Sequence, residues 1–171
     1  MAKNDNEFTD AIMLLKADHQ KVKDLFKQFQ STEDEAKQLA LAGQICDELK
    51  IHAQIEEEIF YPAFRGKIED DMLDEAIVEH DGAKVLINDI VANGSGDDFF
   101  AAKVTVLCEE ITHHVEEEEM PREGMFAQCR ATEVDLVELR DQMMARKQEL
   151  MALAEGKGLP PAELAAINLA A

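Results

Sequence analysis

Apolar residues recur along the chain at steps of three and four positions, and polar stretches that contain Gly or Pro interrupt this pattern. Such steps place side chains on one face of an α-helix, whereas a half-buried strand alternates with a period of two. The interruptions therefore separate five predicted helices. These are about 8–30, 34–61 and 70–92, a fourth helix that Asp97 or Asp98 caps and that reaches Pro121, and about 132–155.

The segments between the predicted helices carry residues that end helices or form turns. A Ser-Thr pair at 31–32 follows the first helix, and Pro62 and Gly66 stop the second. The third helix ends in the loop NGSG at 93–96, whose glycines permit the positive φ of a tight turn. The sequence GKG at 156–158 closes the fifth helix, and the tail LPPAELAAINLAA is either a docking strap or a frayed end.

Four helices joined by short loops pack most simply as an up-down-up-down bundle. We therefore expect an all-α fold, with a four-helix bundle over residues 1–130 and an additional C-terminal helix and tail over 131–171. This helix either packs on the bundle or faces a partner, including a second copy of the chain, because a Met-rich face also makes an adaptable interface. Its apolar residues are Val134, Leu136, Val137, Leu139, Met143, Met144 and Leu150.

Ionisable residues occupy the apolar stripe of each of the first four helices. In chain order they are His19, His52 with Glu56, His80, and His114 with Glu118. Residues four apart share a helix face, so all six side chains should converge on the bundle axis. A single core histidine is usually hydrogen-bonded filler, but two buried carboxylates among four imidazoles need a compensating cation. A metal centre supplies it, because metals bind neutral imidazole and ionised carboxylate directly.

His113 is the remaining histidine of the chain, and helix geometry turns it about 100° from His114. Its own stripe, through Phe99 and Val106, is less consistently apolar. We therefore prefer the pair His114 and Glu118 as the inward one and expect His113 at the rim of the site or behind a ligand. In the Glu-rich runs 56–58 and 116–119, only one member of each is assigned inward and the others are expected to be solvated.

The sequence also contains a weak internal duplication. Asp18-His19 and Glu79-His80 are 61 positions apart, and His52 and His114, each followed by the pattern HxxxE, are 62 apart. Two helical hairpins related by a pseudo-two-fold axis would place one histidine and one His/Glu pair on each side of a central site. The duplication therefore predicts two metal ions bridged by two glutamates.

The ordered set of these motifs resembles the bacterial hemerythrin-like HHE proteins. It consists of His19, HAQIE at 52–56 within IHAQIEEEIFYP, EH at 79–80 and HHVEEEE at 113–119, and the likeness runs from about residue 11 to 126. The resemblance implies a four-helix bundle with a non-haem di-iron centre, in which two oxo- or hydroxo-bridged iron ions have terminal histidines and two bridging carboxylates. The implied ligands are His19, His52, Glu56, His80, His114 and Glu118.

The sequence departs from the oxygen-carrying hemerythrins at three points. Those proteins have a second histidine one turn away on helix three, where this chain has Ala76 and Lys84, and their last carboxylate is an Asp one residue beyond the position of Glu118. Met120-Pro121-Arg122 stands where the family commonly has Phe-Pro, so we expect a kinked or displaced end of helix four. Two six-coordinate irons offer about twelve positions and this donor set with a bridging oxygen fills about ten.

The open positions favour binding of, or reaction with, dioxygen, peroxide or nitric oxide over simple reversible carriage. An enzyme of this kind would be a catalase-like or oxidase-like oxidoreductase. Three alternatives stay open: the same site holding zinc or manganese, an oxygen or redox sensor or iron store that signals through the C-terminal helix, and a ferritin-like centre. The last needs two ExxH motifs, and the chain has one, Glu110 to His113.

Composition narrows the class of partner. The chain has 37 acidic and 17 basic residues and a net charge of −20, which disfavours nucleic acid and membrane surfaces. No apolar run approaches a membrane span and the start, MAKNDNEFTD, is polar, so we expect a cytoplasmic protein with reduced thiols.

Cys46 and Cys108 should be buried small residues, whereas Cys129 is expected to be more exposed. Tyr61, nine positions after His52, should point away from the site.

Overall fold

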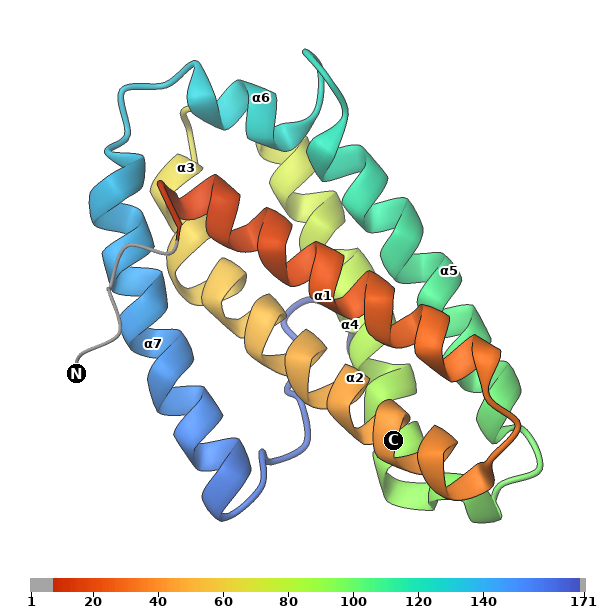
Figure 1. Ribbon diagram of the computed structural model, residues 1–171. Coiled ribbons are helices and arrows are strands. Elements are labelled where there is room, and N and C mark those ends of the chain that lie inside the picture. The colour runs from red at the N-terminus through yellow and green to blue at the C-terminus, as the bar shows by residue number, and fades with distance from the viewer. Residues whose placement is uncertain (1–7, 170–171) are drawn as a thin grey trace.

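The computed structural model describes residues 8–169 and shows the predicted all-α bundle (Figure 1). No strand occurs within this range. Its elements are α1 (Ala11–Ser31), α2 (Glu35–Ile55), the π-helix η1 (Glu56–Phe60), α3 (Tyr61–Phe64), α4 (Asp70–Asn93), the 3₁₀ turn η2 (Gly94–Gly96), α5 (Phe100–Glu119), α6 (Met125–Arg130) and α7 (Leu136–Gly156). The predicted polar start at 1–7 and the last two residues, 170–171, lie outside the described range.

Aspartates cap three of the long helices, because an N-cap carboxylate satisfies backbone N–H groups that lack a helical partner. The carboxylate of Asp10 accepts from Met13 N at 2.9 Å, that of Asp34 accepts from Lys37 N at 3.0 Å, and Asp135 caps α7 in the same way. The predicted cap of the fourth helix is displaced. Phe99 is the N-cap of α5, and the carboxylate of Asp97 accepts from Phe99 N at 2.8 Å in the preceding turn.

The second predicted helix does not stop at Pro62. The π-helix η1 follows α2 directly, with the Tyr61 N–H donating to the Glu56 carbonyl five residues back, and α3 continues to Phe64. Pro62 lies in the first turn of α3, directly after the π turn. The π turn contains one more residue than an α turn, so it rotates every later side chain relative to the α-helical expectation.

The chain leaves α5 immediately after Glu119, in agreement with the predicted displacement of this helix end. Arg122 adopts a positive φ of 73°, and a Cβ on Gly124 would lie 2.5 Å from the Met120 carbonyl oxygen, so this turn requires glycine. The turn leads into the short helix α6, which the sequence pattern missed. Cys129 lies in α6 and is fully buried, so the expected exposed position is wrong.

The core consists of two apolar clusters, one on each side of a polar layer. In α1, Leu15 belongs to one cluster and Val22 to the other, and His19 lies between them. In α4, Ala76 and Ala83 flank His80 in the same way. The ionisable residues therefore occupy a defined level of an otherwise apolar bundle.

The C-terminal helix α7 packs against α1 and α2 (Figure 1). Leu139, Met143 and Leu150 are buried in the same cluster as the ends of α1 and α2. The tail is a docking strap rather than a frayed end: Lys50 donates to the Pro160 carbonyl at 3.2 Å, and Asn88 exchanges two hydrogen bonds with the backbone of Ala162.

None of the helices within residues 8–169 combines the length and apolarity that crossing a membrane requires.

The packing of α7 predicts that Met143→Ala destabilises the protein strongly, because its side chain is 0% exposed and its removal leaves a cavity. We expect the free energy of unfolding to fall by about 2–5 kcal/mol in urea denaturation. Val137→Ala is the matched control, since this residue of α7 is 48% exposed and its truncation should change stability by less than about 0.5 kcal/mol. Equal effects would show that α7 does not contribute to the core.

Candidate metal centre

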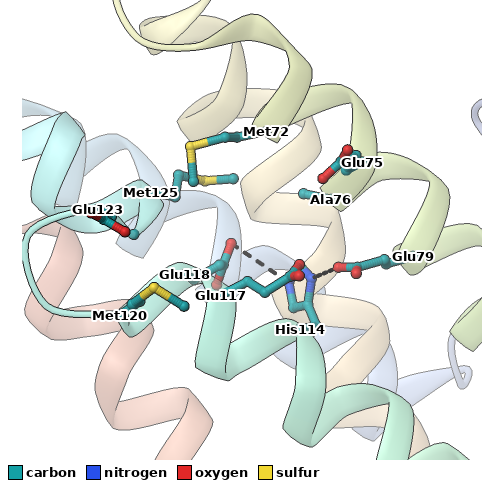
Figure 2. Close-up of a pocket in the computed structure, with 11 residues that line it drawn as sticks. Met72, Glu75, Ala76, Glu79, His114, Glu117, Glu118, Met120, Glu123 and Met125 are labelled. Carbon is teal, nitrogen blue, oxygen red and sulfur yellow. Dashed lines mark hydrogen bonds and ion pairs between the residues drawn. The ribbon is translucent and has the colours of Figure 1, made fainter.

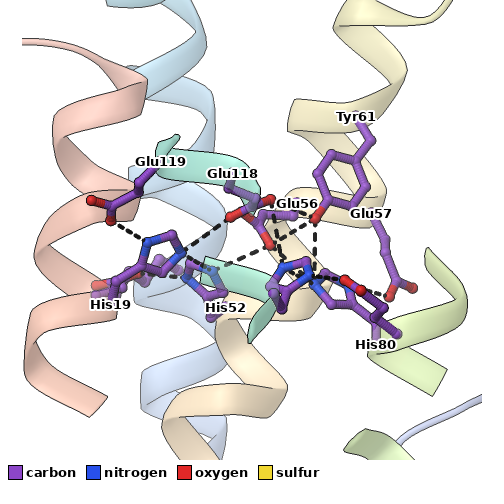
Figure 3. A network of polar contacts seen from close by, with 12 residues as sticks. His19, His52, Glu56, Glu57, Tyr61, His80, Glu118 and Glu119 are labelled. Atoms are coloured by element: carbon purple, nitrogen blue, oxygen red, sulfur yellow. Dashed lines mark hydrogen bonds and ion pairs between the residues drawn. The ribbon is translucent and has the colours of Figure 1, made fainter. Parts of the chain in front are cut away.

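The six inward-facing side chains meet in the polar layer between the two apolar clusters (Figure 3). They form two imidazole pairs: His19 and His52 from α1 and α2, and His80 and His114 from α4 and α5. In each pair the two Nε2 atoms are 3.1 Å apart. The rings therefore present their Nε2 atoms to a common centre from four different helices.

Two glutamates connect the imidazole pairs. The Oε2 atom of Glu56 lies 3.2 Å from His52 Nε2 and 3.3 Å from His80 Nε2. The carboxylate of Glu118 lies 3.3 Å from His19 Nε2 through Oε2 and 3.5 Å from His114 Nε2 through Oε1. Each carboxylate thus contacts one histidine of each pair, which is the arrangement that bridging between two cations requires.

Each histidine also has a carboxylate behind it. His19 Nδ1 lies 2.7 Å from the carboxylate of Glu119, and His114 Nδ1 lies 2.7 Å from that of Glu79. His80 Nδ1 lies 2.9 Å from Glu57, and His52 Nδ1 lies 3.5 Å from Asp18. An ionised carboxylate only accepts, so each Nδ1 donates and each Nε2 is left directed at the centre.

These four partners were missed by the sequence analysis, which treated the other members of the Glu runs as solvated. A signal for them exists, because each partner is the immediate neighbour of an inward residue. Asp18 and Glu79 precede His19 and His80, and they contact the histidine of the next helix. The internal duplication therefore includes the carboxylates that orient the rings as well as the inward residues.

The donor set fits metal ions by two observations. Glu56 is 0% and Glu118 1% exposed, and one oxygen of each, Glu56 Oε1 and Glu118 Oε2, has no hydrogen-bond partner among the described residues. A buried anionic oxygen without a partner is costly. In addition, donor atoms of His19, His52, Glu56 and Glu118 all lie within 4.8 Å of one another, as do those of Glu56, His80 and His114. These two groups share Glu56, and the cluster is capable of binding metal.

In the metal-free chain, protons take the place of the cations. Burial disfavours the charged imidazoles, but the carboxylate of Glu56 and the hydrogen bond with Asp18 outweigh it and raise the pKa of His52 to about 10. Burial likewise opposes the charge of His80, and its contacts with Glu56 and Glu57 raise its pKa to about 9. Burial alone would raise the pKa of Glu56, but the two histidines hold it well below its usual range. Metal ions and protons therefore compete for this site.

Tyr61 lies at the centre, so the expectation that it points away is wrong. Its hydroxyl donates toward Glu118 Oε1 at 2.9 Å and Glu56 Oε2 at 3.2 Å, and it lies 3.4 Å from His80 Nε2 (Figure 3). The expectation assumed 3.6 residues per turn throughout, and the π turn of η1 rotates Tyr61 onto the face of Glu56. Burial and the two carboxylates raise its pKa well above the usual value, so the phenol keeps its proton.

The structure turns His113 outward and His114 inward. His113 is 65% exposed in its side chain and lies 3.2 Å from Glu117, outside the buried cluster. Glu110, its partner in the single ExxH motif, is also exposed, so this motif does not build a ferritin-like centre. Lys84, at one of the two positions of the absent histidine, is buried and lies 2.8 Å from Glu57, the carboxylate behind His80.

Comparison with known proteins agrees with this geometry. The sequence model of the hemerythrin HHE cation binding domain matches residues 10–129. A DNA nickase of Nostoc sp. (strain PCC 7120 / SAG 25.82 / UTEX 2576) is 32% identical over 117 residues, which are 68% of this chain and 32% of the nickase. The chain thus spans about a third of the length of that relative.

The fold is shared with the crystal structure of a hemerythrin HHE cation binding domain-containing protein from Mycobacterium kansasii. The TM-score is 0.69 at 21% sequence identity, and the match covers 89% of this chain and 96% of the other. The matched range 10–129 contains the whole bundle and all six inward-facing side chains. The chain therefore belongs to the hemerythrin HHE cation binding domain family.

Proposed function

We propose that this protein holds two non-haem iron ions and binds or reacts with dioxygen, peroxide or nitric oxide. The observation that carries the proposal is the pair of bridging carboxylates, each with a buried unpartnered oxygen, between two pairs of imidazole Nε2 atoms. Iron in such a donor set supplies redox electrons and open coordination positions for small ligands. The proposed ligands are His19, His52, Glu56, His80, His114 and Glu118.

The surrounding residues favour reaction over carriage. Ala76, at the other position of the absent histidine, is buried and offers no donor atom, so a position near His80 stays free of protein ligands. The Tyr61 hydroxyl lies 3.4 Å from His80 Nε2 and keeps its proton. By turning this proton away from Glu118, it could donate to a small oxygen species bound near His80. The two apolar clusters limit the access of bulk water to this layer.

The alternative to iron at this site is zinc or manganese, because imidazole and carboxylate ligands bind several divalent ions. The nickase activity of the Nostoc protein is not extended to this chain. That relative is about twice as long, and a net charge of −20 opposes binding to a phosphate backbone.

A second candidate function, an oxygen or redox sensor, draws support from a continuous polar path between the site and the tail. His80 Nδ1 lies 2.9 Å from Glu57, which lies 2.8 Å from Lys84 Nζ. Lys84 lies 3.3 Å from the carboxylate of Asp81, which also accepts the N–H of Ala165 at 2.8 Å. A change in the charge at His80 therefore has a physical route to the strap.

Metal analysis with a spectrum tests the proposal directly. We expect two iron ions per chain after loading with iron and exposure to air, with the near-ultraviolet absorption of an oxo-bridged ferric pair. His114→Ala should lose most of the iron and melt at a lower temperature, because bound metal stabilises the folded state. His113→Ala, the adjacent control, should keep its iron after prolonged loading. A wild-type protein that takes up zinc but no iron would contradict the proposal.

The pKa shifts predict the pH dependence of the metal-free protein. The folded-state pKa values of His52, about 10, and His80, about 9, exceed the unfolded value of 6.5. Their contribution to stability is therefore complete below pH 6.5 and is lost as the pH rises toward 10. We expect the melting temperature of chelator-treated protein to fall over this range and that of loaded protein to fall less. A metal-free melting temperature that rises with pH would be inconsistent with this account.

Tyr61→Phe removes the hydroxyl and keeps the ring. We expect the variant to retain two iron ions, because Tyr61 is not among the proposed ligands, and to react with hydrogen peroxide at least about tenfold more slowly, because it loses a proton donor. Stopped-flow absorbance of the loaded protein measures this rate. An unchanged rate would remove Tyr61 from the reaction, and loss of iron would make it a ligand.

A further inference from the structure

A cavity of about 170 Å³ extends from the surface toward the buried centre, between α4, α5 and the turn that leads to α6 (Figure 2). This space accommodates several water molecules, since one needs about 10–15 Å³. Its inner wall contains His114 and Glu118. Its outer wall carries Glu75, Glu79, Glu117 and Glu123, and no lysine or arginine lines it. The cavity is therefore an acid-lined opening onto two of the proposed ligands.

A second group of side chains that could hold a metal ion lies beside this opening: Glu79 and Glu117 line the cavity, and His113 contacts both. Donor atoms of Glu79, His113 and Glu117 all lie within 4.8 Å of one another. His113 Nε2 is 3.2 Å from Glu117 Oε1 and 3.7 Å from Glu79 Oε1. One imidazole and two carboxylates are the same donor types as in the buried centre, but these are in contact with solvent.

Glu79 connects the two groups. Its Oε2 atom lies 2.7 Å from His114 Nδ1 (Figure 2). Its Oε1 atom lies 3.7 Å from His113 Nε2. The same side chain thus holds one ring of the buried centre and belongs to the outer group. Only the Glu79 side chain would then separate an ion bound by the outer group from His114, a proposed ligand of the buried centre.

The inner end of the cavity offers an acceptor for a cation. Glu118 lines the cavity and is 1% exposed, and its Oε1 atom lies 3.5 Å from His114 Nε2. Its Oε2 atom faces His19 Nε2 at 3.3 Å and makes no hydrogen bond among the described residues. A carboxylate at each end of the cavity attracts a divalent cation and repels an anion. The cavity therefore provides a continuous set of oxygen donors from solvent to the buried layer.

A second opening onto the centre carries more basic than acidic side chains. A cavity of about 470 Å³ on the α1 side reaches His19 and is lined by Lys16, Lys23 and Lys27, with Glu116 and Glu119. Ammonium groups there oppose the approach of a divalent cation. Of these two openings, the acid-lined one is the favourable route for a metal ion.

From these observations we propose that Glu79, His113 and Glu117 form an outer site that captures a divalent metal ion and transfers it through the cavity to the buried centre. This inference rests on the proposed metal function of the inner cluster. The outer group has three protein donors and is exposed, so its ion exchanges readily, as transfer requires. The inner cluster has more donors and is buried, so the ion moves inward.

The test measures metal uptake rather than activity. Chelator-treated full-length protein is mixed with Co²⁺ in a stopped-flow instrument, and the visible absorption of the bound ion is followed. Glu117→Gln and His113→Gln should each slow loading of the buried centre at least fivefold and leave the final Co²⁺ content unchanged. Glu116→Gln is the matched control: it removes the same charge from the adjacent residue of α5, which lines the lysine-lined cavity.

Four results are decisive. Slower loading in the two outer-site variants, with wild-type loading in Glu116→Gln, supports the inference. Equal loading rates in all three variants would overturn the inference and leave the proposed function intact. A lower final Co²⁺ content in Glu117→Gln would also overturn it, because Glu117 would then belong to the inner centre. Failure of the wild-type protein to bind Co²⁺ or Fe²⁺ at the buried cluster would instead overturn the proposed function.

Discussion

The architecture depends on one constraint: a layer of buried carboxylates and imidazoles needs positive charge at its centre. Glu56 and Glu118 are almost fully enclosed, and apolar clusters lie above and below them. Neither hydrogen bonds among the described residues nor solvent satisfy all their oxygens. Protons on His52 and His80 help to meet this need in the metal-free chain, and metal ions would meet it with fixed geometry and more donors. The stability of the bundle and its chemistry are therefore linked through the same groups.

The internal duplication explains how a short sequence builds so many contacts. In Asp18-His19 the histidine reaches the centre, and the aspartate contacts His52 on the neighbouring helix. In Glu56-Glu57 the first carboxylate reaches the centre and the second contacts His80. Each short motif thus supplies an inward group and orients a ring from another helix. The helices are held in register by the residues that would bind the metal.

The α-helical period was sufficient to identify the bundle and the six inward side chains. Five of them lie in regular α-helix, and the sixth, Glu56, directly follows α2, before the π turn changes the period. His19 between Leu15 and Val22 is the clearest case. The same reasoning failed at Tyr61, where a π turn changes the period, and a period of 3.6 contains no information about such a turn. It also failed for Cys129, because the short helix α6 is too brief to show periodicity. The tail has no periodicity at all, and its docking depends on individual contacts such as those of Asn88.

The most direct test of the central claim is an anomalous difference map, at the iron absorption edge, from crystals of the iron-loaded protein. The account predicts two peaks in the buried layer, one beside His19 and His52 and the other beside His80 and His114, with both glutamates between them. A layer without peaks, or a single ion bound elsewhere, would contradict the claim that metal ions neutralise these buried carboxylates.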